Sequence, residues 1–107
     1  MNSDEFAKAC KDEMEIIFRS YISKDGETAV ARHLAKLNLK EDKRIIAEKM
    51  IRDVMTDVYY GFLLSLDGES TMGGIQLQYK LYDEGGNLVF EPGELEADAW
   101  KYFQEKE

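Results

Sequence analysis

The chain of 107 residues contains only one cysteine, one histidine and one proline. Cys10 has no partner for an internal disulfide, and together with His33 it falls short of the four ligands of a structural zinc site. No segment reaches the roughly 18 apolar residues of a membrane span, and residues 1–10 lack the apolar run of a secretory signal. These absences predict a reduced, cytoplasmic protein.

The sequence also lacks the short motifs that mark common active sites. It contains no Walker loop and no HExxH, GxSxG or GxGxxG string. Cys10 shares a predicted helix face with Phe6, Met14 and Ile17, so we expect a buried, unreactive thiol. His33 lies beside an apolar stripe, as a boundary residue does. We therefore predict no catalytic residue, no metal site and no cofactor. The sequence leaves enzymatic activity open but favours a protein that is not an enzyme.

Basic residues become scarce in the second part of the chain. Residues 1–66 hold 11 Lys and Arg against 12 Asp and Glu, whereas residues 67–107 hold 3 Lys against 10 acids. The C-terminal part therefore carries −7 of the total charge of −8. Such a surface repels nucleic acid and attracts basic proteins, although solubility alone is another use of the charge. We expect neither a nucleic-acid nor a membrane partner.

Apolar residues at spacings of three and four predict three helices before residue 67. The first begins after Asn2 or Ser3, the second extends from a Thr28 cap to Asn38, and the third begins near Glu41. The caps are side chains that can accept hydrogen bonds from the first free backbone N–H groups.

The end of the third helix leaves two alternatives. A helix over residues 41–66 would be about 39 Å long, longer than the roughly 34 Å diameter of a compact globule of this size. Either this helix continues to Leu66, apolar on all sides and buried on all sides, or it ends near Asp57 and residues 58–66 form a strand. The unbroken periodicity favours the helix.

Strict alternation from residue 75 onward predicts a strand. Four apolar residues, Ile75, Leu77, Tyr79 and Leu81, are expected to face the core. Residues 83–87 have turn chemistry, residues 88–90 form a returning strand, and residues 95–103 form a last helix. The predicted fold is a single α+β domain over residues 1–107: three N-terminal helices, the third one long, a β-hairpin or three-stranded meander, and a C-terminal helix.

Carboxylates are the abundant chemical groups. Asp67, Glu69, Asp83 and Glu84 could converge on a divalent cation, which would make the chain a small metal-dependent or hydrolytic domain. The same residues are also ordinary turn residues, and we favour that interpretation.

The acidic segment before and within the last helix is the candidate partner-binding surface. Its predicted residues are Glu91, Glu94, Glu96, Asp98 and Trp100. Negative charge in a first helical turn favours the helix dipole, which explains part of this pattern but not the shortage of Lys and Arg. We predict a non-enzymatic protein-binding domain that covers a basic partner surface; a structural homodimer is the remaining alternative.

Three strings carry a resemblance over residues 54–103. They are YGFLLSLDGE at 60–69, DEGGN at 83–87 and GEL at 93–95. The chain resembles small acidic bacterial proteins, some of them immunity-like proteins associated with polymorphic toxins. The resemblance implies a cytoplasmic binding protein without enzymatic activity. Glu96 stands where those sequences carry a histidine, so no site residue is transferred.

Overall fold

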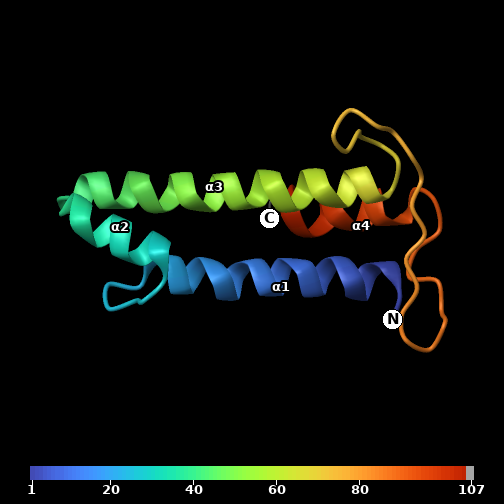
Figure 1. Ribbon diagram of the computed structural model, residues 1–107, viewed down its shortest axis with the longest axis horizontal. Coiled ribbons are helices and arrows are strands. Elements are labelled where there is room, and N and C mark those ends of the chain that lie inside the picture. The colour runs from blue at the N-terminus through green and yellow to red at the C-terminus, as the bar shows by residue number, and fades with distance from the viewer. Residues whose placement is uncertain (106–107) are drawn as a thin grey trace.

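The computed structural model describes residues 1–105, which form four helices and no β-sheet (Figure 1). The helices are α1 (Ser3–Ile22), α2 (Ala29–Leu37), α3 (Glu41–Leu66) and α4 (Glu94–Phe103). The protein is 62% helical with 4% strand or bridge, so the predicted α+β fold with a hairpin or meander is wrong. The molecule is elongated, with extents of 47 × 30 × 29 Å.

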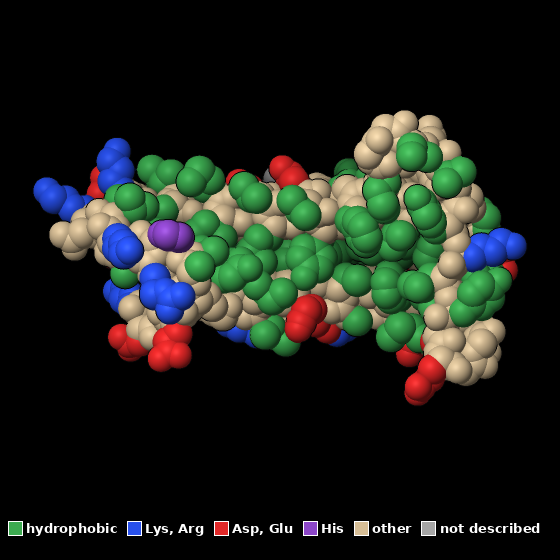
Figure 2. Space-filling view, in the orientation of Figure 1, with side chains coloured by type: hydrophobic (Ala, Val, Ile, Leu, Met, Phe, Trp, Pro, Cys, Tyr) green, Lys and Arg blue, Asp and Glu red, His purple; other side chains and the backbone are tan. Residues whose placement is uncertain are grey.

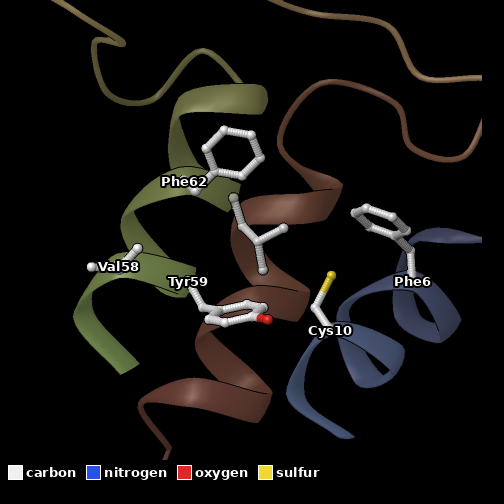
Figure 3. Close-up of a pocket in the computed structure, with 6 residues that line it drawn as sticks. Phe6, Cys10, Val58, Tyr59 and Phe62 are labelled. Carbon is white, nitrogen blue, oxygen red and sulfur yellow. The ribbon is translucent and has the colours of Figure 1, made fainter. Parts of the chain in front are cut away.

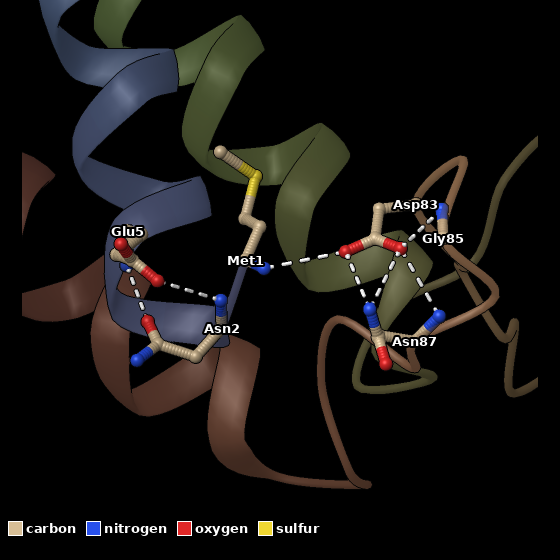
Figure 4. A network of polar contacts seen from close by, with 6 residues as sticks. All are labelled: Met1, Asn2, Glu5, Asp83, Gly85 and Asn87. Carbon is tan, nitrogen blue, oxygen red and sulfur yellow. Dashed lines mark hydrogen bonds and ion pairs between the residues drawn. The ribbon is translucent and has the colours of Figure 1, made fainter.

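The predicted helix starts are confirmed by their hydrogen bonds. The Asn2 side chain accepts a hydrogen bond from the Glu5 backbone N–H, and the Glu5 carboxylate accepts one from the Asn2 backbone N–H, which makes a capping box (Figure 4). The Thr28 hydroxyl accepts a hydrogen bond from Ala31 at the start of α2, and Asn38 ends that helix in a left-handed conformation. These caps act locally, which is why sequence pattern identifies them.

The helical alternative for residues 58–66 is confirmed, because α3 continues unbroken to Leu66. The 47 Å long axis of the molecule accommodates a helix of this length. The expectation that its last turns are buried on all sides is wrong, since Val58 is 64% and Phe62 is 53% exposed. α3 is therefore a helix with an apolar side that the rest of the described chain leaves uncovered.

The core lies among α1, α3 and α4. Its buried members are Ala7, Met14, Leu63, Val89, Phe90, Leu95, Ala99 and Phe103. α4 passes behind α3 in Figure 1, while α2 packs on the far end of α1. At the other end of α1, Asp4 accepts hydrogen bonds of 2.9 Å from both Lys101 and Tyr102 of α4. These two donors lower the pKa of the Asp4 carboxyl.

Residues 67–93 form an extended, irregular segment in place of the predicted hairpin. Isolated bridges join Met72 to Ile75 and Tyr82 to Leu88. Ile75 and Leu77 are 61% and 55% exposed, so the predicted inward register is wrong for both. Tyr79 is half-buried and Leu81 packs against the core. The segment follows the end of the helical bundle and does not build a sheet of its own.

None of the helices within residues 1–105 combines the length and the apolar character needed to cross a membrane.

Candidate functional site

Two of the predicted partner-binding residues, Glu96 and Trp100, line the same surface hollow. This hollow, of about 430 Å³, lies between α3 and α4 and is completed by Tyr60, Gly93 and Ala97. Glu96 and Trp100 are four residues apart on α4, so they lie on one side of the helix. The Trp100 ring meets the Tyr60 ring edge to face, with 6.4 Å between centroids, and stays 55% exposed. We call this feature the acid–aromatic hollow.

The carboxyl of Glu96 has an electrostatic environment that disfavours its charge. Burial raises its pKa first, and the neighbouring Glu69 carboxyl and then Asp67 raise it further. Adjacent carboxyls repel one another when both are ionised, so a cation between Glu96 and Glu69 would relieve this repulsion. The hollow therefore combines the exposed ring of Trp100 and the half-buried ring of Tyr60 with a carboxylate whose charged form is favoured by a positive neighbour.

The remaining predicted residues have different positions. Glu94 is turned back on its own helix start, where its carboxylate accepts a hydrogen bond of 2.6 Å from the Glu91 backbone N–H. Both of these acids are exposed, whereas Asp98 is half-buried and does not line the hollow. The sequence did not group Tyr60 and Glu69 with Glu96, because the structure brings the end of α3 and the loop after it against α4, and no local pattern encodes that contact.

The loop carboxylates of the metal-site alternative do not converge. Both oxygens of Asp67 accept backbone hydrogen bonds from the start of α4. Asp83 accepts hydrogen bonds from Gly85 and Asn87 and pairs with the amino group of Met1 (Figure 4). Within residues 1–105, no group of three or more His, Cys, Asp or Glu side chains could hold a metal ion. Asp67 and Asp83 organise the backbone, as turn residues do.

A second feature, unrelated to the predicted residues, is an apolar groove between α1 and α3. Figure 2 shows hydrophobic side chains gathered along the junction of these helices and over the loop that follows α3. A hollow of about 250 Å³ there is lined by Phe6, Cys10, Val58, Tyr59, Phe62 and Leu63. In Figure 3, side chains from α1 and α3 face this common space.

Cys10 lies in this groove and not in the closed core. The predicted burial is therefore wrong in degree, since the side chain is half-buried. Partial burial raises the pKa of the Cys10 thiol, which keeps it protonated and weakly nucleophilic at neutral pH. Phe6 and Ile17 share the predicted face with it and are half-buried too, whereas Met14 is fully buried.

Comparison of the chain with protein-family models, with curated proteins and with solved structures finds no match.

Proposed function

We propose that this chain is a non-enzymatic protein-binding domain that recognises a basic partner surface through the acid–aromatic hollow. The observation that carries the proposal is the position of Glu96 beside the exposed ring of Trp100 and the half-buried ring of Tyr60. A guanidinium or ammonium group in such a hollow gains both an ion pair and a cation–π contact. The ligand that fits is therefore an arginine or lysine side chain of the partner.

The charge around the hollow supports the same partner. Residues 67–107 carry a net charge of −7, and Glu91 and Glu94 are exposed at the start of the helix that holds Glu96 and Trp100. A field of one sign accelerates the approach of a partner of opposite sign and fixes its orientation. An immunity protein or similar inhibitor, acting in the cytoplasm on a basic toxin or nuclease, is the form of this function that the sequence resemblance favours.

The chain contains its own reporter for the test, because Trp100 is its only tryptophan. An arginine-rich peptide is titrated into the protein while the tryptophan emission is recorded, and an acidic peptide of equal length is the control probe. We expect the basic peptide alone to change the emission. The Glu96→Gln change should weaken binding by about threefold to tenfold, as expected for loss of a partly exposed ion pair.

A matched variant separates a specific site from general attraction. Glu13→Gln alters net charge by the same amount, and Glu13 is exposed on α1, away from the hollow. If both variants weaken binding equally, the acidic surface acts only through its total charge and the proposed site is wrong. With a natural partner captured from source cells, replacing Glu91, Glu94, Glu96 and Asp98 by amides should slow association more than it speeds dissociation.

A further inference from the structure

The apolar groove between α1 and α3 is unusual for a monomeric surface. Val58 and Phe62 are each more than half exposed beside the hollow that they line with Phe6 and Cys10. None of the six described side chains that line this hollow is charged. On a chain with net charge −8, an uncharged face of this kind is a place where another surface can approach without like charges meeting.

The molecule as a whole exposes more surface than a compact monomer. Its accessible surface is 7418 Å², whereas a folded monomer of its mass has about 6,100 Å². Its radius of gyration is 16.4 Å, against about 13 Å for a compact chain of this length. The excess of about 1,300 Å² is comparable to the roughly 800 Å² that each partner buries in a stable interface.

The shape of the groove indicates what covers it. Val54, Val58 and Phe62 are exposed at a spacing of four residues, which makes a ridge along α3. The hollow lies directly beside this ridge and shares Val58 and Phe62 with it. Ridges of this kind on two facing helices interdigitate at an angle of about −50°. Ridge and hollow thus form one patch that can match itself across a two-fold axis.

We infer that a second copy of this chain occupies the groove, so that the protein forms a two-fold symmetric dimer through α1 and α3. The ridge of each copy lies in the hollow of the other. A small apolar ligand could fill the hollow, but it would leave the ridge in water.

This dimer uses the side of α3 opposite to the acid–aromatic hollow. Tyr60 and Phe62 are two residues apart, which places them about 160° apart around the helix, measured the shorter way. The dimer surface and the partner-binding hollow are therefore different surfaces, and each can be tested without the other.

Sedimentation of the full chain from low to high micromolar concentration tests the inference. We expect the average mass to rise from 12.3 kDa towards twice that value. Val58→Glu should weaken dimerisation at least tenfold, because it places one carboxylate of each copy in the apolar interface. Leu37→Glu is the matched control: Leu37 is 63% exposed on α2, outside both the ridge and the hollow, so dimerisation should be unchanged. Equal circular dichroism spectra establish that both variants are folded.

Cys10 supplies a second, independent readout. Because its thiol lies in the groove, its labelling rate with a maleimide should fall as the protein concentration rises. Val58→Glu should abolish this protection. The inference is overturned by a mass of one chain at all concentrations, by equal effects of the two glutamate variants, or by a dimer that leaves Cys10 labelling unchanged. A monomer that binds a small apolar dye in the groove also overturns it.

Discussion

Asp67, the residue that follows α3, caps α4 by accepting a hydrogen bond of 2.8 Å from the backbone N–H of Glu96. Its other carboxylate oxygen accepts a bond of 2.9 Å from the Gly93 N–H. Gly93 precedes α4 and has no side chain with which to cap it. The cap is therefore supplied by a residue 26 positions earlier, and it fixes the end of one helix to the start of another.

Removing this carboxylate should destabilise the protein strongly. Asp67 is only 1% exposed, so Asp67→Ala leaves two backbone N–H groups of α4 without their partner. We expect a loss of about 2–4 kcal/mol in the free energy of unfolding. Urea denaturation followed by circular dichroism measures it. Asp57→Ala, at an exposed position of α3, is the control and should change stability by about 0.5 kcal/mol or less. Equal midpoints for both variants would show that the cap contributes nothing.

Within the extended segment of residues 67–93, a new carboxylate should destabilise the protein at one position and leave its stability nearly unchanged at another. Leu77 is exposed, whereas Leu81 packs against the core. We expect Leu77→Asp to cost about 0.5 kcal/mol or less and Leu81→Asp to cost about 2 kcal/mol or more. Thermal melts of the two variants, compared with the original chain, decide the matter. If the Leu77→Asp protein unfolds, Leu77 faces the core as the alternation predicts, and its exposed position in the structure is wrong.

Two glycines should respond in opposite directions to alanine. Gly61 lies inside α3 with open space where a Cβ would be, so Gly61→Ala should stabilise the protein by about 0.5–1 kcal/mol. A Cβ at Gly26 would lie 2.9 Å from the Ala31 Cβ and 3.0 Å from the Ser20 carbonyl oxygen. Gly26→Ala should therefore be destabilising. Denaturant midpoints of the two variants measure both effects, and a shift of the same sign in both would contradict the local geometry.

Glu96 should titrate above the usual range of a glutamate. Burial raises its pKa first, followed by repulsion from Glu69. The folded protein therefore holds this proton more tightly than the unfolded chain, and its contribution to stability rises as the pH falls through the raised pKa. We expect Glu96→Gln to stabilise the protein at neutral pH, and Glu69→Gln to lower the pKa of Glu96. A carbon-detected NMR titration of the Glu96 carboxyl measures its pKa. A value in the usual glutamate range would contradict the prediction.

The helices could be predicted from the sequence because their determinants are local. Asn2, Thr28 and Asn38 cap the helices whose apolar periodicity they flank, and each confirmed boundary depends on contacts within a few residues. The absence of a hairpin could not be predicted, because the alternation from residue 75 onward shows only that every second residue is apolar. It does not show that a neighbouring strand is present. A strand also needs a neighbour, and the backbone of Tyr79 and Leu81 finds single bonds to Leu66 and Val89 and no continuous ladder.

The candidate sites were only partly visible in the sequence. Glu96 and Trp100 share a helix face, so their proximity follows from spacing, and the structure brings both into the hollow. Tyr60 comes from α3, and Asp67, which looked like a turn residue, joins the end of α3 to the start of α4 by two hydrogen bonds. The apolar groove was missed for a different reason: an all-apolar helix indicates burial, and only the arrangement of α1, α3 and α4 shows which side remains open.

The contact between Asp4 and Tyr102 also has a consequence for how the chain is made. α1 emerges from the ribosome early, while α4, which completes the core, is synthesised about 80 residues later. At about 5–20 residues per second this interval lasts roughly 4–16 s. During it α1 can pack only on α2 and α3, so the core that Ala7 and Met14 share with α4 is incomplete. The nascent chain thus passes through a stage in which an amphipathic helix hairpin must avoid aggregation, and slowing translation before residue 94 should increase its dependence on chaperones.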